Sequence, residues 1–342
     1  MEGAAWEQSG ALARAPALTT VLAEPAPLVA TDVQPAPPGA AAEWFSGPGG
    51  VRLRAALFPV GGDVRGSVVV SPGRTEPIGK YFEVGRELTA RGFVTLVHDW
   101  RGQGLSHRLL PDRRLGHAVG YADFLADYAA LIAAFEARLP RPWIALGHSM
   151  GGCLALLAMA EGESRFSAAI LSAPMLGIRT GTVPAPLARL LATTLTRIGA
   201  GGRATPGPES LTIPFEANIV THDRERYARN EALIEACADL GLGSPTWGWL
   251  DFAFSATARL AAGPGVPRIA APVTVVAAGA DALVDNAALA VVTARLRQGR
   301  YVEIPGAFHE ILQETDSVRA VFWREFDDLA RCVSLEPNLS KT

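Results

Sequence analysis

The stretch Trp143–Gly151, WIALGHSMG, decides the fold of this chain. It opens with an apolar run typical of a buried strand, and residues 153–160 (CLALLAMA) continue as a buried helix. Gly147, Ser149 and Gly151 match the pattern G-x-S-x-G, in which the two glycines relieve crowding in a tight strand-to-helix turn. Such a turn exposes the serine Oγ at the helix N-terminus, where free N–H groups can stabilise an oxyanion. We therefore expect Ser149 to be a nucleophile.

Outward from this turn, short apolar runs alternate with longer segments of helical periodicity. The expected strands are residues 68–71, 93–98, 143–147, 168–172, 273–277 and 301–304. Apolar residues recur at spacings of three and four in residues 81–91 and 121–139, which predicts amphipathic helices there. This alternation is typical of an α/β fold with a mostly parallel central sheet flanked by helices.

The chain divides into five segments. Residues 1–43 are rich in Ala and Pro, and we expect a flexible or surface-wrapped N-terminal tail. Residues 44–175 and 261–334 would form the two parts of the α/β core. Between them, residues 176–260 contain no good strand and are broken by Gly and Pro, which predicts a helical cap insertion. Residues 335–342 would be a C-terminal tail.

Composition excludes several classes of protein. The 342 residues carry 31 Lys and Arg against 34 Asp and Glu, a net charge of −3 that gives no attraction to nucleic acid. Cys153, Cys237 and Cys332 have the spacing neither of a metal site nor of a disulfide framework, and we expect no metal. The chain shows neither a signal peptide nor a transmembrane segment, so we expect a cytoplasmic location, with contact at the membrane periphery as an option.

A serine nucleophile needs a histidine base and a carboxylate that orients it. After this kind of turn the order along the chain is serine, acid, histidine, which selects His309 among six histidines. His309 follows the last expected strand, and Asp281 follows the strand before it, so both lie at carboxyl ends. Asp285 is the other candidate acid, but its position before a helix suits an N-cap.

Backbone N–H groups complete the expected site. One donor should follow the serine, at Met150, and the other should come from the loop after an early strand, at Arg74. A further loop, Gly102-Gln103-Gly104, lacks the Lys and spacing of a phosphate-binding loop, and we interpret it as a tight loop beside the active site.

The expected cap supplies many apolar residues that could hold an acyl chain. Trp247 and Trp249 are candidates for substrate binding, although two tryptophans in an apolar helix are also typical of a core. The residues expected along an apolar tunnel are Leu187, Leu190, Leu191, Phe215, Trp247, Trp249, Leu250 and Phe252.

Several segments together resemble the α/β-hydrolase branch of monoacylglycerol lipases and bacterial lysophospholipases, over about residues 44–329. They are the serine turn and residues 71–76 (SPGRTE), 98–106 (HDWRGQGLS), 171–175 (LSAPM), 309–312 (HEIL), 218 and 221–227 (THDRERY). The resemblance implies a triad of Ser149, Asp281 and His309, with Arg74 and Met150 as oxyanion donors. Many relatives have His-Gly where this chain has Pro72-Gly73, so any role of that histidine does not transfer.

The resemblance implies a serine hydrolase that needs no cofactor and cleaves the ester of a monoacyl lipid through an acyl-enzyme. Its partner would be a small acyl ester or a lipid, and transient contact with a membrane surface is an option. The sequence does not indicate the oligomeric state. A small-ester esterase or serine peptidase on the same fold stays open. A non-catalytic binding protein is the third alternative, and the presence of all three triad candidates counts against it.

Overall fold

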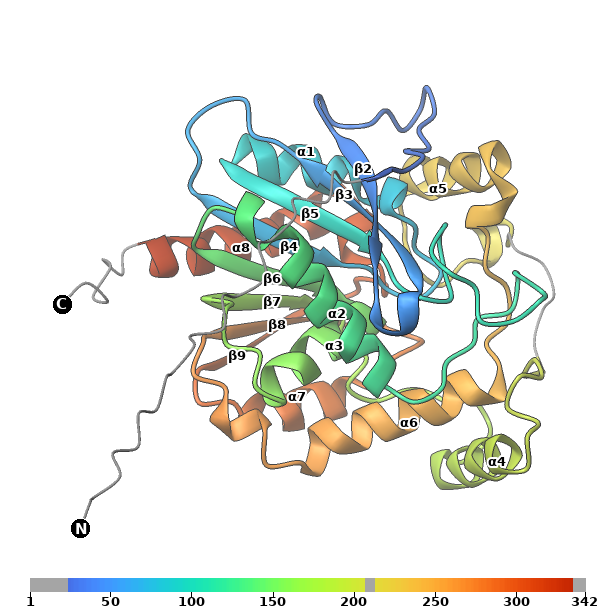
Figure 1. Ribbon diagram of the computed structural model, residues 1–342. Helices are drawn as coiled ribbons and strands as arrows, with labels where there is room; N and C mark the ends of the chain where they lie inside the picture. Colours follow the sequence, from blue (N-terminus) through green and yellow to red (C-terminus); the bar gives the residue numbers. More distant parts are fainter. Residues whose placement is uncertain (1–23, 207–212, 335–342) are drawn as a thin grey trace, which may run out of the picture.

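A nine-stranded, mostly parallel sheet forms the centre of the computed structural model, which describes residues 24–206 and 213–334 (Figure 1). The strand order is β1-β2-β3-β5-β4-β6-β7-β8-β9. The pairs from β5 to β9 are parallel, whereas β1, β2 and β3 add antiparallel strands at one edge.

The elements have the following bounds. The strands are β1 Glu24–Pro25, β2 Ala41–Ser46, β3 Arg52–Phe58, β4 Gly66–Ser71, β5 Phe93–Asp99, β6 Trp143–His148, β7 Ala168–Ser172, β8 Val273–Ala278 and β9 Gly299–Ile304. The helices are α1 Phe82–Ala90, α2 Ala122–Phe135, α3 Ser149–Ala160, α4 Ala185–Arg197, α5 Arg224–Ala236, α6 Trp247–Ala262, α7 Asn286–Ala294 and α8 Asp316–Ser334.

Helices cover both faces of the sheet, so the central strands are buried on both sides. Val69 lies in the core beneath α2, α3, α6 and α7, whereas Val68 and Val70 lie in the core beneath α1 and α8. Because successive side chains of a strand point to opposite faces, these strands read as continuous apolar runs. The six strands predicted from such runs are confirmed.

The antiparallel strands β1, β2 and β3 were not expected from the sequence. In β3 the apolar pattern is interrupted by Arg54, which is nevertheless fully buried. Its guanidinium pairs with the equally buried Asp99 of β5, with Arg54 Nε 2.8 Å from Asp99 Oδ2. A buried charge is tolerated when it is paired and hydrogen-bonded, and that pairing is not visible in the sequence of β3 alone.

The segment from 24 to 43, expected as part of a tail, contains β1 and the start of β2. It wraps over the molecule, and Gln34 is buried there with its amide donating to Gly79 O at 3.1 Å. Residues 1–23 of the expected tail and the expected C-terminal tail 335–342 lie outside the described residues.

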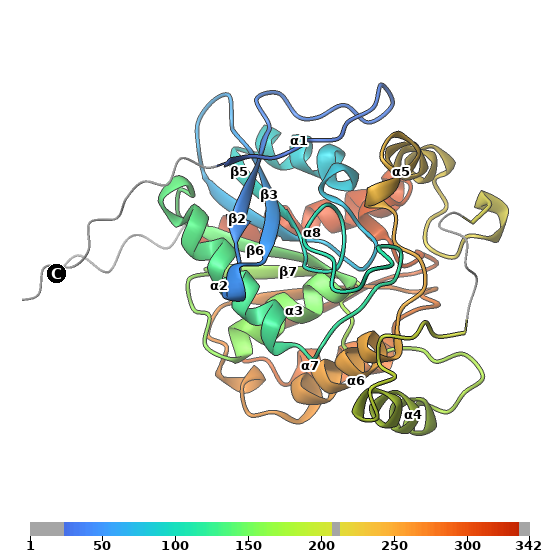
Figure 2. The same cartoon turned by 45° about the vertical axis from the view of Figure 1, so that its right-hand side comes forward.

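The three helices of the expected cap do not lie together. Figures 1 and 2 show α4 on the outer side of α6, at the bottom of both views, and α5 apart from them at the upper right. Arg226 of α5 forms ion pairs with Glu83 of α1 and Asp316 of α8. In α6, Phe252 and Leu260 belong to the main core of the sheet, and the expected cap boundary at 260 falls inside this helix.

The parallel strands place three important loops at one edge. β6, β8 and β9 run in the same direction, so the segments that follow His148, Ala278 and Ile304 leave the sheet at its carboxyl edge. Ser149, Asp281 and His309 lie in these segments. The topology therefore gathers the predicted triad at one end of the sheet.

Candidate active site

The turn at Ser149 has the backbone geometry that the G-x-S-x-G pattern predicts. Ser149 has φ +50°, a left-handed conformation that is strained for a residue with a side chain. A Cβ at Gly147 would lie 2.6 Å from Gly152 Cα, and one at Gly151 would lie 2.0 Å from Ser71 O. Only glycine allows the backbone to pass so closely, which explains both glycines of the pattern.

A chain of two hydrogen bonds joins the three predicted triad residues. His309 Nε2 lies 2.9 Å from Ser149 Oγ, and His309 Nδ1 lies 2.7 Å from Asp281 Oδ2. Asp281 and His309 are both buried. The imidazole is therefore held between a hydroxyl and a carboxylate.

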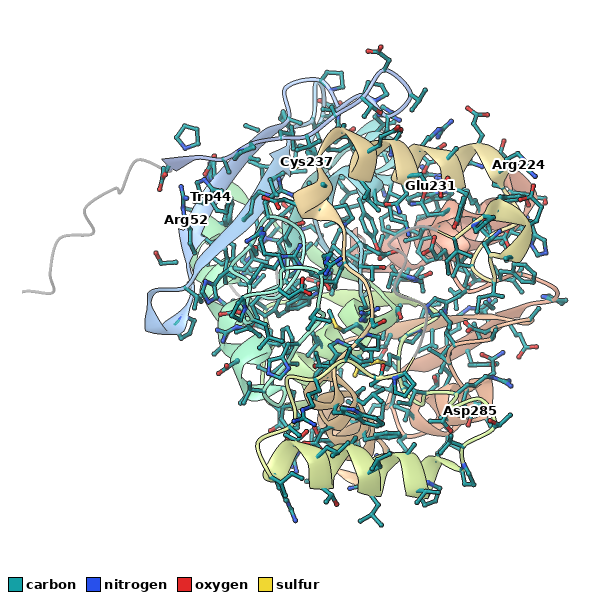
Figure 3. The ribbon with its side chains drawn as sticks, turned by 90° about the vertical axis from the view of Figure 1, so that its right-hand side faces the viewer. Trp44, Arg52, Arg224, Glu231, Cys237 and Asp285 are labelled. Carbon is teal, nitrogen blue, oxygen red and sulfur yellow. The ribbon has the colours of Figure 1, made fainter. Side chains whose placement is uncertain are left out.

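Asp281, rather than Asp285, contacts the histidine. Burial raises the pKa of Asp281, but the hydrogen bond and charge of His309 and the N–H groups of Val284 and Leu283 lower it on balance. Asp285 caps α7 by accepting from Ala287 N–H at 3.1 Å, and Figure 3 shows it toward the surface. The two aspartates thus have separate roles in the fold.

The two expected oxyanion donors lie on segments that touch each other. Met150 is in the first turn of α3, where backbone N–H groups have no partner within the helix. The loop that carries Arg74 is pressed against this turn, because Gly151 packs on the carbonyls of Ser71 and Pro72. The structure therefore brings the loop that leads into Arg74 against the turn that carries Ser149 and Met150.

A buried acid beside the site was not recognised in the sequence. Glu76 Oε2 accepts hydrogen bonds from Gly73 N–H and Tyr81 Oη, each at 2.5 Å. Burial raises the pKa of Glu76, but the Lys80 ammonium and the Tyr81 hydroxyl overcome this and lower it to about 2. The carboxylate is therefore charged at neutral pH and holds the loop before Arg74.

Lys80 connects Glu76 to the loop that carries His309 through two ion pairs. Lys80 Nζ lies 2.9 Å from Glu76 Oε1 and 2.6 Å from Glu310 Oε1, next to His309 in the chain. The His148 ring, next to Ser149 in the chain, contacts the His309 ring at 4.8 Å between centroids. Burial lowers the pKa of His148, so its ring is neutral at pH 7. The sequence signal for this network is the spacing of Glu76 and Lys80, which lie four residues apart in the chain.

The candidate substrate-binding residues separate in the structure. Trp249 lines a small cavity of about 10 Å³ together with Met150, Phe124 and Leu242. Trp247 instead packs in a satellite cluster between α4 and α6. Trp249 is therefore close to the expected oxyanion donors and Trp247 is not.

The expectation that leucines of α4 line an acyl tunnel is wrong. Leu187, Leu190 and Leu191 are 55%, 64% and 42% exposed, because α4 turns Ala188 and Ala192 toward α6. Small residues allow the two helices to approach closely, which leaves the large side chains on the outside.

Three observations outside this site bear on other functions. A larger cavity of about 880 Å³ lies at the opposite, amino edge of the sheet, near Ser167 and Val273. Within residues 24–206 and 213–334, no group of three His, Cys, Asp or Glu side chains could hold a metal ion. No helix among the described residues combines the length and apolarity needed to cross a bilayer.

Comparisons with known proteins identify the family of this chain. Residues 62–316 match the family described as serine aminopeptidase, S33. Lysophospholipase L2 of Escherichia coli strain K12 is 35% identical over 269 residues, which cover 74% of this chain and 77% of that protein. A monoacylglycerol lipase of Mycolicibacterium smegmatis is 27% identical over 80% of this chain and 91% of its own length.

Solved structures share the fold. A soluble variant of the monoglyceride lipase of Saccharomyces cerevisiae, in complex with a substrate analogue, superposes with a TM-score of 0.67 at 20% identity. The superposition covers 85% of this chain and 94% of that one. A carboxyl esterase of Bacillus coagulans gives a TM-score of 0.66 at 17% identity, over 86% and 99% of the two chains. The chain therefore belongs to the serine aminopeptidase S33 family of α/β-hydrolases, in the branch of the lysophospholipases and monoacylglycerol lipases.

Proposed function

We propose that this protein hydrolyses the carboxylic ester of a monoacyl lipid, a lysophospholipid or a monoacylglycerol, through an acyl-enzyme intermediate. The observation that carries the proposal is the chain of hydrogen bonds from Ser149 through His309 to Asp281. The names of its relatives, lysophospholipase L2 and monoacylglycerol lipase, support the substrate class.

In the acylation step, Ser149 Oγ attacks the ester carbonyl carbon while its proton passes to His309 Nε2. The carbonyl oxygen becomes an oxyanion, which the N–H groups of Arg74 and Met150 stabilise. Collapse of this intermediate breaks the bond to the alcohol, and His309 gives its proton to the leaving oxygen. The products of this step are the acyl-enzyme and the free head-group alcohol.

Deacylation repeats the same steps with water as the nucleophile. His309 accepts a proton from water, the hydroxide adds to the acyl carbon, and Ser149 leaves with the proton returned by His309. Asp281 stays ionised throughout, holds the Nδ1–H tautomer and stabilises the imidazolium that forms twice per cycle.

We propose that the protein acts at a membrane surface and that α4 is the element that contacts this surface. Its outer face exposes three leucines, and Val183 and Ile198 flank them at 43% and 70% exposure. Residues 179–203 contain four arginines and no acidic residue. An apolar face edged with arginines suits the interface of an anionic phospholipid bilayer. The cytoplasmic location expected from the sequence stays a prediction.

Ser149→Ala should abolish covalent labelling by a fluorophosphonate, because only an activated serine attacks this reagent. Gel fluorescence measures the labelling, and circular dichroism with thermal unfolding verifies the fold. A folded variant that is still labelled would show that another residue is the nucleophile.

Asp281→Asn should lower kcat by roughly 10⁴-fold, because His309 loses the carboxylate that fixes its tautomer. Asp285→Asn is the matched control, since an asparagine can still cap α7 and should leave kcat near the wild-type value. Steady-state hydrolysis of a p-nitrophenyl ester measures both. The assignment of the acid is wrong if the substitution at 285 is the more damaging one.

The value of kcat/KM should rise with acyl chain length by up to about tenfold for each two methylenes, and then reach a plateau, because each buried CH₂ contributes about 0.8 kcal/mol. The apolar groups beside Met150, including Trp249 and Leu242, motivate this expectation. Esters from acetyl to dodecanoyl, assayed below their micellar limits, give the profile. A flat profile, or preference for an aminoacyl arylamide, would favour the small-ester or peptidase alternative.

The double variant Leu187→Ser/Leu190→Ser should lower binding to anionic vesicles several-fold, because it removes the most exposed leucines of α4. Co-sedimentation with phosphatidylcholine vesicles, with and without phosphatidylglycerol, measures it. Val291→Ser is the control, since Val291 is 59% exposed on α7. Equal binding of the wild type and the double variant, or no binding by either, contradicts the membrane contact.

A further inference from the structure

The loop Gly102-Gln103-Gly104 lies against the oxyanion loop and has no part in the reaction steps given above. The Gln103 side chain is buried, and its Nε2 donates to Gly73 O at 2.8 Å, with a longer contact of 3.4 Å to Glu76 O. The carbonyl of Gly73 and the N–H of Arg74 belong to the same peptide bond. Gln103 therefore holds the peptide that carries the expected oxyanion donor.

The direction of the Arg74 N–H follows from this contact. A trans peptide bond is planar, and its C=O and N–H point in opposite directions. Fixing the Gly73 carbonyl on Gln103 thus also fixes the Arg74 N–H, which points to the opposite side of the peptide, away from Gln103. Among the described residues the Arg74 N–H donates to no protein acceptor, which leaves it free for a substrate oxygen.

The preceding peptide bond is fixed at both of its ends. Trp100 Nε1 donates to Pro72 O at 2.9 Å, and the Gly73 N–H donates to Glu76. A Cβ at Gly73 would lie 2.8 Å from Glu76 Oε2 and 2.9 Å from His148 Cδ2, so the loop needs glycine here. Glycine allows many backbone conformations, and outside contacts must select one of them.

The loop that carries Gln103 is itself rigid. Gly102 and Gly104 have φ +85° and +55°, and a Cβ at Gly104 would lie 2.1 Å from Asp99 Cγ. Asp99 Oδ2 accepts the Leu105 N–H at 2.9 Å, and Arg108 donates to the carbonyls of Gly102 and Gly104. A side-chain amide on such a support keeps its position during turnover.

We propose that Gln103 is a positioning residue of the oxyanion hole, which acts by fixing the Gly73–Arg74 peptide so that the Arg74 N–H faces the reacting carbonyl. The inference rests on the proposed acyl-transfer function. It predicts an effect on the tetrahedral intermediate, in which the oxyanion exists, and little effect on the binding of the planar ester.

The test compares Gln103→Met with Gln34→Met. Methionine keeps the length and volume of glutamine and removes the amide donor. Gln34 is the matched control, because it is equally buried and also donates to a backbone carbonyl, that of Gly79, away from the oxyanion loop. Three quantities are measured: kcat and KM for a p-nitrophenyl ester, the pH profile of kcat/KM, and the inhibition constant of an alkyl trifluoromethyl ketone.

Gln103→Met should lower kcat by roughly 10- to 100-fold, with KM changed by less than about threefold, since the loss falls on the transition state. Ketone binding should weaken by a similar factor, because Ser149 adds to the ketone carbon to form a bound oxyanion. The pH profile should keep its midpoint, since His309 and Asp281 are untouched. Gln34→Met should change none of these values, although both variants lose a buried hydrogen bond.

Gln103→Asn gives a second variant that keeps an amide but draws it back by one methylene, and it should lose activity in the same direction. If the wild type is active and the Gln103 variants have the same kcat and ketone affinity as the wild type, the positioning role is wrong, whereas the proposed function stands. A wild type that neither turns over esters nor binds the ketone contradicts the proposed function itself.

Discussion

The site depends on one close backbone contact, that of Gly151 with the carbonyls of Ser71 and Pro72. It joins the turn after β6 to the loop after β4, two neighbouring parallel strands. Because no side chain separates the two segments, Ser149 and the two expected oxyanion donors come from backbone whose relative position is fixed. The strained φ of Ser149 persists because the packing of both segments allows no other path.

Buried charges support the loops around this contact. Asp99 pairs with Arg54 and also accepts the Ile78 and Leu105 N–H groups, so one carboxylate fixes β3 and two loops. Glu76, together with Lys80, connects the oxyanion loop with the segment of His309. Removing Arg54 or Lys80 would leave a buried carboxylate, that of Asp99 or Glu76, without its cationic partner, which costs much more than the pair contributes. These carboxylates therefore fix the loops that surround the site.

Much of the architecture could be predicted from local patterns. Strands β4 to β8 are buried on both faces and read as short apolar runs, and the G-x-S-x-G turn sets the polypeptide direction at Ser149. His309 and Asp281 could be selected because chain order and strand ends restrict the candidates. The strand β3 could not be predicted, since Arg54 breaks its apolar pattern and the partner Asp99 lies 45 residues away. The strands β1 and β2 carry no continuous apolar run, because β1 has two exposed residues and β2 is exposed at both ends.

The sequence by itself determined the parallel part of the sheet, the serine turn and the segments that meet at the carboxyl edge, because these follow from periodicity, glycine spacing and strand order. Only the tertiary structure decided which side chains those residues meet. It separated Asp281 from Asp285, set Glu76 and Gln103 on the Gly73 backbone, and turned Leu187 outward. The physical reason is that hydrogen bonds and helix faces depend on partners distant in the chain, which no local pattern encodes.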